Sequence, residues 1–387
     1  MEICIITGLY PPYGRGGAEA VAASAATEFN RAGHEVIVIT AKPFSGMESL
    51  WPKKTVENGI IIYRFFPLNI FFYGNIGKHN FLLRAFWHLF DIWNIHASFC
   101  LAHILEKVRP DIVATHNLKG FGLIVPSTLY SVRRDKEIPY KWIHTAHDVQ
   151  LVSPSGLLRP GEENKLHNKI FSFLTRALFC SPDVVVSPSK WLLDFYSERG
   201  FFPKSDKKVV KNLVKRGSLI NVSGSIKNSF LYLGQIEEHK GILFLLDAWK
   251  GFSASHPDVG LTIAGGGALL PEVIKIAKEM PSVKVLGAVP HGATGSLYGA
   301  HRATIVPSLV YENAPAVISE SLSYGVPVLA SRIGGIPEMV DEGISGLLFA
   351  PGNIDSLLAA MEKFVAVPFV PNPPQPQNYA EQILLAI

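Results

Sequence analysis

The sequence contains few cysteines and no long hydrophobic run, and each absence excludes a class of protein. Cys4, Cys100 and Cys180 are odd in number, lie far apart and form no Cys-x-x-Cys pair, which argues against a disulfide framework and against a zinc ribbon. No uninterrupted apolar run reaches the roughly 18 residues of a membrane span, and the N-terminus shows no signal-peptide pattern. We therefore expect a protein of the reducing cytoplasm.

Acidic motifs that would hold a metal or a dinucleotide are missing as well. The chain has no Asp-x-Asp sequence, so a divalent cation bound to a diphosphate would find no obvious carboxylate ligands. A glycine-rich loop follows the first predicted strand, but Glu19 stands where a dinucleotide fingerprint needs a further glycine, and residues 40–42 lack the expected acid. We therefore predict that the protein uses no metal and no cofactor.

The composition is that of a globular protein with two differently charged halves. The 387 residues are 48% hydrophobic and 18% charged, which suits two domains of ordinary size and excludes a disordered chain. Residues 1–216 hold 27 Lys and Arg against 18 Asp and Glu, whereas residues 217–387 hold 9 against 14. We expect the two halves to meet different partners, none of them a nucleic acid.

Short apolar runs alternate with helical sequence in both halves of the chain. The runs that predict buried strands lie at residues 3–7, 36–39, 111–115, 141–144, 183–186, 230–234, 261–264, 283–286, 303–306 and 326–329. Strands that alternate with helices indicate an α/β fold with two Rossmann-like, doubly wound parallel-sheet domains facing across a cleft. We predict an N-terminal domain over 1–215, a C-terminal domain over 229–365, and a Pro-rich connector and tail over 366–387.

The most informative motif lies between residues 307 and 320. Pro315 suits the first turn of a helix, so Glu312 falls in the preceding loop and Glu320 falls inside the helix. A helix N-terminus binds phosphate, and each carboxylate can accept hydrogen bonds from a diol. This layout, with Asn313 and Ala314 beside the helix start, fits a nucleotide sugar, whose diphosphate lies between a sugar and a ribose. The competing interpretation is two glutamates on a solvated surface helix.

Two other loops of the second half offer further donor-binding groups. Gln235 and Lys240 follow a predicted strand, and Lys240 can neutralise the charge of a diphosphate leaving group. Gly266 follows the next strand, where a glycine lets the backbone approach a phosphate. A solvated lysine and an ordinary glycine turn are the competing interpretations.

In the first half, candidate residues lie in two loops that follow predicted strands. Gly16 and Gly17 open a helix and can form a binding loop for an anion or an acceptor, with a plain tight turn as the alternative. His144 and His147 end a strand at the cleft edge and can orient a sugar or relay a proton. A place in the core is the alternative for at least one of the two histidines.

Residues 60–109 are unusually rich in aromatic side chains. The rings belong to Phe65, Phe66, Phe71, Phe72, Tyr73, Phe81, Phe86, Trp87, Phe90, Trp93 and Phe99. Core packing accounts for part of them, but there are more rings than two ordinary helices need. Together with the basic charge of this half, the excess suits a helix pair on an anionic membrane surface, or a groove for a lipid tail.

In this order the motifs resemble retaining glycosyltransferases of family 4, which have the GT-B fold. The matching segments lie at residues 16–19, 33–36, 147–148, 187–190, 240–241, 312–320, 325–328, 334–338 and 343–347. The resemblance implies that Glu312 binds the hydroxyls of the donor sugar, that Glu320 binds the ribose and that Lys240 binds the diphosphate. The family usually has an arginine where this chain has Gln235, so one of two diphosphate-binding cations is missing.

On the acceptor side, the resemblance implies that Gly16 and Gly17 lie close to the phosphates. It also implies that His147 contacts the donor sugar beside the reacting carbon, with His144 as the second choice. The implied activity is a retaining, metal-independent hexosyl transfer from a nucleotide-diphosphate sugar to a glycan or lipid-linked acceptor, in cell-envelope polysaccharide or glycolipid synthesis at the inner face of the plasma membrane. The alternatives are a sugar-nucleotide epimerase or hydrolase on the same fold, and a glycan-binding protein with impaired catalysis.

Overall fold

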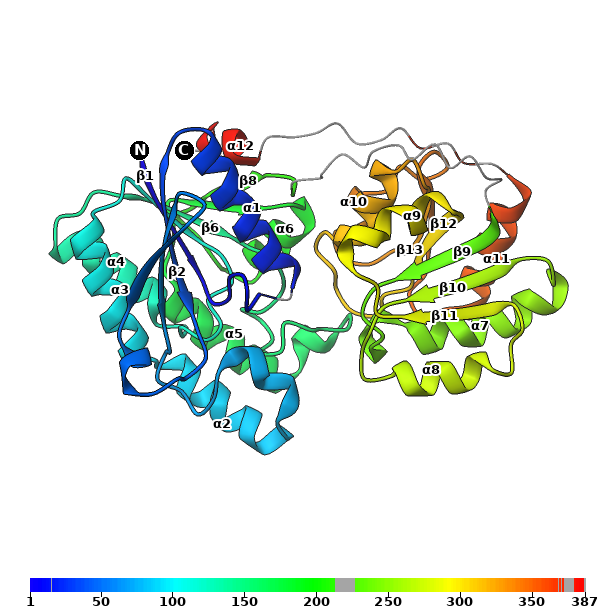
Figure 1. The fold of residues 1–387 in the computed structure, drawn as a ribbon, viewed down its shortest axis with the longest axis horizontal. Coiled ribbons are helices and arrows are strands. Elements are labelled where there is room, and N and C mark those ends of the chain that lie inside the picture. Colours follow the sequence, from blue (N-terminus) through cyan, green and yellow to red (C-terminus); the bar gives the residue numbers. More distant parts are fainter. Residues whose placement is uncertain (15, 213–226, 368, 370, 372–378, 386–387) are drawn as a thin grey trace. The chain divides into compact units, whose positions relative to one another are not determined.

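The computed structural model describes residues 1–14, 16–212, 227–367, 369, 371 and 379–385 (Figure 1). The described residues fall into two compact units. The first takes its residues from Met1–Gly156, Gly161–Leu213 and Asn378–Ile387, and the second from Leu157–Pro160 and Val214–Gln377. Most of the linker predicted between about residues 213 and 228, and most of the Pro-rich connector, lie outside the described residues.

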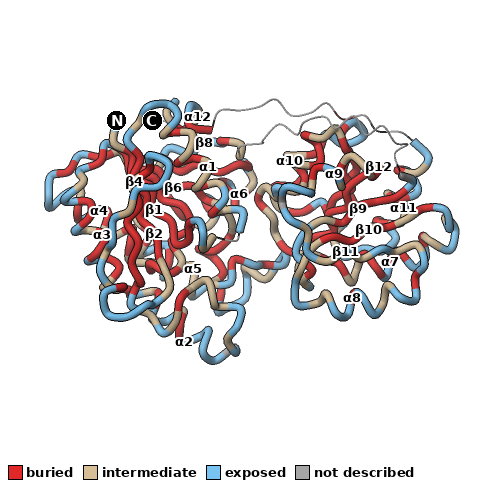
Figure 2. Tube along the Cα trace, viewed as in Figure 1, coloured by how far each residue is buried: buried red, intermediate tan, exposed pale blue. Residues whose placement is uncertain are grey.

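The first unit is built on an eight-stranded sheet with the order β3-β4-β2-β1-β5-β6-β7-β8. Its strands are β1 Glu2–Thr7, β2 Glu35–Ala41, β3 Lys53–Glu57, β4 Ile60–Phe65, β5 Ile112–Thr115, β6 Lys141–Thr145, β7 Val184–Ser187 and β8 Asp206–Val209. All neighbours run parallel except β3 and β4. Every residue of β5 and β7 is buried, as strands covered on both faces require (Figure 2).

Helices cover both faces of this sheet. They are α1 Gly17–Arg31, α2 Phe81–Ile92, α3 Ile95–Val108, α4 Val125–Asp135, α5 Leu166–Phe179, α6 Lys190–Glu198 and the C-terminal α12 Tyr379–Leu385. Successive residues of a strand point to opposite faces, so Ile143 of β6 joins the core under α1, whereas His144 packs against Phe179 of α5. α12 returns to this unit, where the Ala380 N–H donates to the Glu28 carboxylate of α1 at 3.0 Å.

The second unit has a six-stranded, fully parallel sheet with the order β11-β10-β9-β12-β13-β14. Its strands are β9 Lys227–Leu233, β10 Gly260–Ala264, β11 Val283–Gly287, β12 His301–Val306, β13 Val328–Ser331 and β14 Gly346–Phe349. Its helices are α7 Ile242–Ser255, α8 Leu270–Ala277, α9 Thr294–Gly299, α10 Ala316–Ser323 and α11 Ile354–Ala366. Phe230 of β9 joins the core formed with α7 and α11, while Leu231 joins the core on the other face, beside α9.

Both sheets reverse their strand order next to the first strand of the unit. In the first unit the reversal lies between β1 and β5, and in the second unit it lies between β9 and β12. The loops that leave the carboxyl ends of such a strand pair diverge, and this topological switch point is where open α/β sheets bind ligands. The fold therefore provides one candidate binding position in each unit.

Candidate functional site

In the second unit, an ion pair joins the two loops at the switch point. Lys240 ends the short 3-10 turn Glu238–Lys240 after β9, and Glu312 lies in the loop that connects β12 with α10. The Lys240 Nζ lies 2.5 Å from the Glu312 Oε1, and the Ser308 hydroxyl donates to the same oxygen at 3.0 Å. The predicted phosphate-binding cation and the predicted sugar-binding carboxylate are therefore adjacent, although 71 residues separate them in the sequence.

The backbone holds both loops in place. The Leu309 N–H donates to the His239 carbonyl at 2.9 Å, and the Gly335 N–H donates to the Glu312 carbonyl at 2.8 Å. Gly241 has a φ of +74°, and a side chain there would collide with the Pro307 carbonyl. Only glycine adopts this conformation at such close range without strain, so the Lys240–Glu312 geometry is built into the fold.

The second carboxylate of the motif lies in the second turn of α10. Pro315 is the N-cap of this helix and has an extended conformation, and no side chain caps the first turn. The Tyr298 hydroxyl of α9 donates to the Glu320 Oε2 at 2.8 Å. Burial and the negative charge of Glu320 raise the pKa of Tyr298, so this hydroxyl stays protonated and fixes the orientation of the carboxylate.

The two residues between the carboxylates differ in exposure. Asn313 is buried, whereas Ala314 is partly exposed directly before the N-cap of α10. Small residues at a helix start leave its N–H groups accessible to an anion. Glu312, Asn313, Ala314 and Glu320 are therefore all brought to the N-terminal end of one helix, as the sequence predicts.

The glycine loop after β10 packs against the loop after β9. Side chains at Gly265 and Gly267 would collide with the carbonyls of Gly234 and Ile236, whereas a side chain at Gly266 would meet only the Ala288 Cβ at 3.6 Å. The Ile236 N–H donates to the Gly266 carbonyl at 2.9 Å. The glycine run thus allows the two loops to pack closely. Within this run, Gly266, the predicted phosphate-binding position, has space for a side chain.

Gln235 lies in the same pair of loops and is exposed. Its carbonyl accepts a hydrogen bond from the Tyr232 hydroxyl at 2.6 Å, which fixes the backbone of the β9 loop. The exposed side chain stands five residues before Lys240. A longer cationic side chain at this position would therefore add positive charge to the loop that already carries Lys240.

In the first unit, two histidines meet beyond the ends of β5 and β6. The His116 Nδ1 lies 2.9 Å from the His147 Nε2, and the rings stack with centroids 5.1 Å apart. Burial lowers the pKa of His147 to about 4, and burial next to His147 and His144 lowers the pKa of His116 well below its usual value. Both rings are therefore neutral at physiological pH, and His147 can act there as a hydrogen-bonding group and not as a cation.

His144 lies in the core. It is 2% exposed, its ring packs on Phe179 and Phe202, and its Nδ1 lies 3.0 Å from the Thr115 hydroxyl. Burial lowers the pKa of His144 to about 3. Of the two histidines singled out in the sequence, only His147 is partly exposed.

Gly16 and Gly17 start α1 at the end of the β1 loop. Gly16 is the N-cap, and the carboxylate of the buried Glu19 occupies the space that a side chain at Gly16 would need. The backbone N–H groups of Gly16 and Glu19 bind this carboxylate, while burial raises its pKa. A glutamate at the third helical position that reaches back to the N-cap N–H is half of a capping box, so Glu19 has a structural reason to replace a glycine.

Comparison with known sequences assigns both halves of the chain. Residues 15–216 match the family model described as Glycosyltransferase Family 4, and residues 220–383 match the one described as Glycosyl transferases group 1. The first match alone covers more than half of the chain. The chain belongs to glycosyltransferase family 4.

Individual relatives agree with this assignment. An uncharacterized 42.6 kDa protein in the cps region of Klebsiella pneumoniae is 27% identical over 348 residues, which are 88% of this chain and 87% of the relative. A lipopolysaccharide 1,2-N-acetylglucosaminetransferase of Salmonella typhimurium is 29% identical over 203 residues, 47% of this chain and 53% of the relative. The structure of Anabaena HepE in complex with UDP and glucose superposes with a TM-score of 0.64 at 17% identity, covering 94% of this chain and 89% of HepE. With its two parallel sheets, the family 4 glycosyltransferase has the predicted GT-B fold.

The structure adds residues to the candidate site in the first unit that the sequence did not single out. His116 and Lys119 follow β5, and Lys119 and Asp148 both lie near Gly156, where a Cβ would be 3.3 Å from the Lys119 Nζ and from the Asp148 Oδ2. Burial lowers the pKa of Lys119, and the carboxylates of Asp148 and Asp91 oppose this shift. The available signal was three polar residues, His116, Asn117 and Lys119, directly after a buried strand.

No described helix is long and apolar enough to cross a membrane. Among the same residues, no group of three His, Cys, Asp or Glu side chains is arranged to hold a metal ion. Metal independence stays a prediction, because it concerns the reaction with bound donor.

Proposed function

We propose that this family 4 glycosyltransferase transfers a hexose from a nucleoside-diphosphate sugar to a glycan or lipid-linked acceptor, with retention of the anomeric configuration and without a metal. The donor binds to the second unit at the β9–β12 switch point. The acceptor binds to the first unit beside His147. The relatives support this proposal, since one is a lipopolysaccharide sugar transferase and HepE holds UDP and glucose.

The observation that carries the proposal is the 2.5 Å contact between Lys240 and Glu312 at the loop before α10. In a nucleotide sugar the reacting carbon joins the sugar ring to the diphosphate, so groups for both parts have to stand together. Glu312 would accept hydrogen bonds from sugar hydroxyls, while Lys240 and the first N–H groups of α10 would bind the diphosphate. Glu320, held by Tyr298, would accept hydrogen bonds from the two ribose hydroxyls.

Catalysis in this scheme depends on stabilising the leaving group. The glycosidic bond to the diphosphate breaks, the sugar becomes oxocarbenium-like, and the acceptor oxygen attacks from the same face. Lys240 and the α10 dipole stabilise the negative charge of the departing diphosphate, which accepts the acceptor proton. The neutral ring of His147 would donate or accept a hydrogen bond at a sugar hydroxyl beside the reacting carbon.

This chain has one cation fewer than is usual in its family to stabilise the negative charge of the departing diphosphate. Gln235 replaces the usual arginine, and loss of one such stabilising donor commonly costs about 2.7–4 kcal/mol in the barrier. The charge of Lys240 and the dipole at the N-terminus of α10 therefore have to supply most of the electrostatic stabilisation of the leaving diphosphate. We infer that the enzyme is active but sensitive to any change at Lys240.

The test is incubation of the purified protein with a panel of labelled nucleotide sugars, with and without glycan and lipid-linked acceptors. We expect label to move to one acceptor class, with the anomeric configuration of the donor kept in the product. An isomerised donor would indicate an epimerase, free sugar would indicate a hydrolase, and binding without turnover would indicate a glycan-binding protein. Any of these three results, obtained with acceptors of both classes present, would contradict the proposal.

A further inference from the structure

Large apolar side chains are exposed along nearly the whole length of helix α2. Leu82, Leu83, Phe86, Leu89 and Phe90 are each between 40% and 66% exposed. Among the described side chains of this helix, only Trp87 and Asp91 are buried. Scattered exposed apolar residues are normal, but a continuous helical surface of this kind marks an interaction site.

Helix α5 has the same character. Leu166, Ile170, Phe173 and Leu174 are between 42% and 74% exposed. Their spacing of three and four residues places them along one face of the helix. Two helices of the first unit therefore present apolar side chains that no described part of the unit covers.

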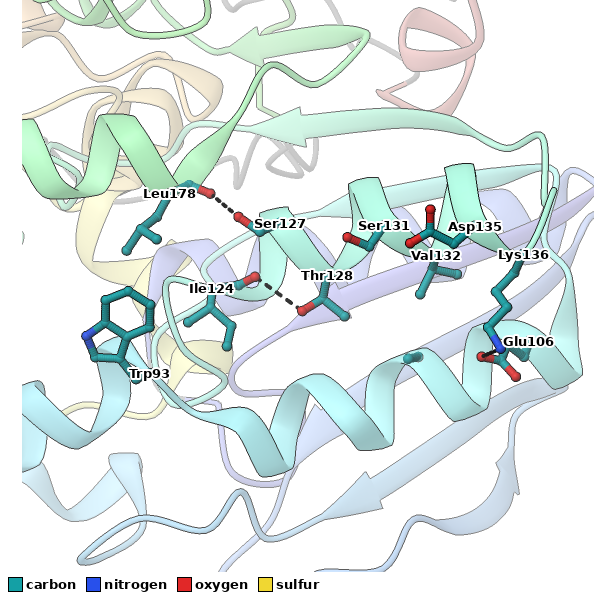
Figure 3. Close-up of a pocket in the computed structure, with 11 residues that line it drawn as sticks. Trp93, Glu106, Ile124, Ser127, Thr128, Ser131, Val132, Asp135, Lys136 and Leu178 are labelled. Carbon is teal, nitrogen blue, oxygen red and sulfur yellow. Dashed lines mark hydrogen bonds and ion pairs between the residues drawn. The ribbon is translucent and has the colours of Figure 1, made fainter.

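One groove connects the ends of both helices. Trp93, directly after α2, and Leu178, near the end of α5, line a groove of about 430 Å³ together with residues of α3 and α4 (Figure 3). The hydroxyls of Ser127 and Thr128 in this groove donate to the carbonyls of Leu178 and Ile124, so they are already paired (Figure 3). The groove contains none of the predicted site residues, and it places the ends of α2 and α5 on one side of the unit.

The charges on the two helices have one sign. The exposed Arg84 of α2 and the exposed Lys169 and Arg176 of α5 are basic. The only acid in either helix is Asp91, which is buried. A surface of apolar side chains with basic residues beside them is complementary to an anionic lipid surface, where each Lys or Arg adds to binding.

We propose that the exposed faces of α2 and α5 form a docking surface for a membrane that contains anionic lipid. The apolar side chains enter the headgroup boundary, and Arg84, Lys169 and Arg176 contact lipid phosphates. The inference deepens the proposed function and rests on it in one respect, because a lipid-linked acceptor gives the first unit a reason to lie on a bilayer.

A second copy of the chain fits this surface less well. A two-fold symmetric contact brings the same patch of both subunits together, and here it would place Lys169 and Arg176 against cations of the partner. Like charges brought together across an interface oppose association. The charge of the surface therefore favours lipid over self-association.

The test is flotation of the purified full chain with vesicles of phosphatidylcholine alone or mixed equally with phosphatidylglycerol. We expect binding to the mixed vesicles and little binding to the neutral ones. Phe86→Ser with Phe90→Ser should reduce binding at least tenfold, and Lys169→Glu should reduce it at least fivefold. Ile344→Ser and Lys275→Glu, exposed positions of the second unit, are the matched controls and should bind like the wild type.

Three results would overturn this inference: equal binding to both kinds of vesicle, unchanged binding of the α2 and α5 variants, or a wild-type dimer that the Phe86 and Phe90 changes convert to monomers. Circular dichroism and thermal unfolding check that each variant is folded, and nucleotide-sugar binding by calorimetry checks that the donor site of the second unit is intact. The same measurement separates the two proposals. If the wild type binds the donor but not the mixed vesicles, the docking surface alone is contradicted. If the wild type fails to bind the donor, the proposed function alone is contradicted.

Discussion

The Lys240 ammonium and the Glu312 carboxylate form a 2.5 Å ion pair between the loops that follow β9 and β12. Their side chains are 27% and 14% exposed, so the pair is partly shielded from water but still open to a ligand. A bound diphosphate would share the lysine with Glu312, and the sugar hydroxyls would satisfy the carboxylate in return. In the proposed function, this pair is a preformed site whose two charges are already compensated before the donor binds.

Removal of the lysine should affect catalysis more than folding. We predict that Lys240→Ala lowers kcat/KM for the donor about 100-fold or more, because the leaving group loses its main cation. Lys250→Ala, an exposed lysine of α7 in the same unit, should keep wild-type kinetics. Steady-state assays with the identified donor measure both. Equal rates for the two variants would remove Lys240 from the site.

The Tyr298 hydroxyl should act through Glu320. Glu320→Gln is expected to weaken binding of the nucleoside diphosphate and to lower turnover more than tenfold, since the carboxylate would hold the ribose. Tyr298→Phe should weaken binding about tenfold or less, because one hydrogen bond to a charged group is lost while the carboxylate stays. Calorimetric titration with the nucleotide gives both values, and Tyr324→Phe in the stacked neighbouring ring is the control. Stronger loss in Tyr298→Phe than in Glu320→Gln would contradict the positioning role.

A gain of affinity should follow from restoring the missing cation. Gln235 is exposed beside the loop that carries Lys240, so Gln235→Arg adds charge without disturbing the core. We predict tighter donor binding, by about tenfold, for a charge-assisted contact to the diphosphate. Gln235→Met, similar in length but uncharged, is the comparison. Unchanged affinity in Gln235→Arg would mean that another group already supplies the charge.

Acid should destabilise the first unit through its buried histidines. The pKa of His144 is lowered to about 3 and that of His147 to about 4, so between these values and about 6.5 the unfolded chain binds protons that the folded chain does not. Each of these buried histidines therefore lowers the free energy of unfolding by up to about 1.4 kcal/mol for each pH unit below 6.5. Asp91, whose pKa burial raises to about 7, acts in the opposite direction over part of this range.

Urea unfolding at pH 7, 6 and 5 tests this balance. The wild type should lose stability steadily across the series, because the three histidines 116, 144 and 147 outnumber Asp91. His144→Gln should show a shallower loss, whereas His103→Gln at an exposed position of α3 should keep the wild-type slope. If His144→Gln and the wild type share one slope, the buried neutral state of His144 is wrong.

Much of the fold could be predicted from hydrophobic patterning. Buried parallel strands appear as short apolar runs, and β1, β2, β5, β6, β7, β9, β10, β11, β12 and β13 lie within a few residues of the predicted positions. The edge strands β3 and β8 were not predicted, because their residues are mostly exposed and polar and form no apolar run.

The structure of the aromatic segment is only partly predictable from its sequence. Residues 60–109 suggested a helix pair, and α2 and α3 are there, but Ile60–Phe65 is the buried strand β4 and carries the first of the rings. Phe65 and Trp87 are core residues, whereas Phe86 and Phe90 are exposed. A single sequence does not distinguish a ring that packs inward from one that packs outward when both lie on the same helix.

The site was predictable where one loop carries it. Glu312 and Glu320 belong to one segment, so their positions around the start of α10 follow from local sequence. The Tyr298–Glu320 contact and the His116–His147 contact join different elements. Such pairs depend on strand order, which a single sequence does not contain.

The most direct measurement is a crystal structure of the protein with a nucleoside diphosphate bound. We predict phosphate oxygens at the first turn of α10 and within hydrogen-bond distance of the Lys240 Nζ, with both ribose hydroxyls on the Glu320 carboxylate. A nucleotide that binds elsewhere on the second unit, with the Lys240–Glu312 pair undisturbed and Glu320 still contacted only by Tyr298, would contradict it.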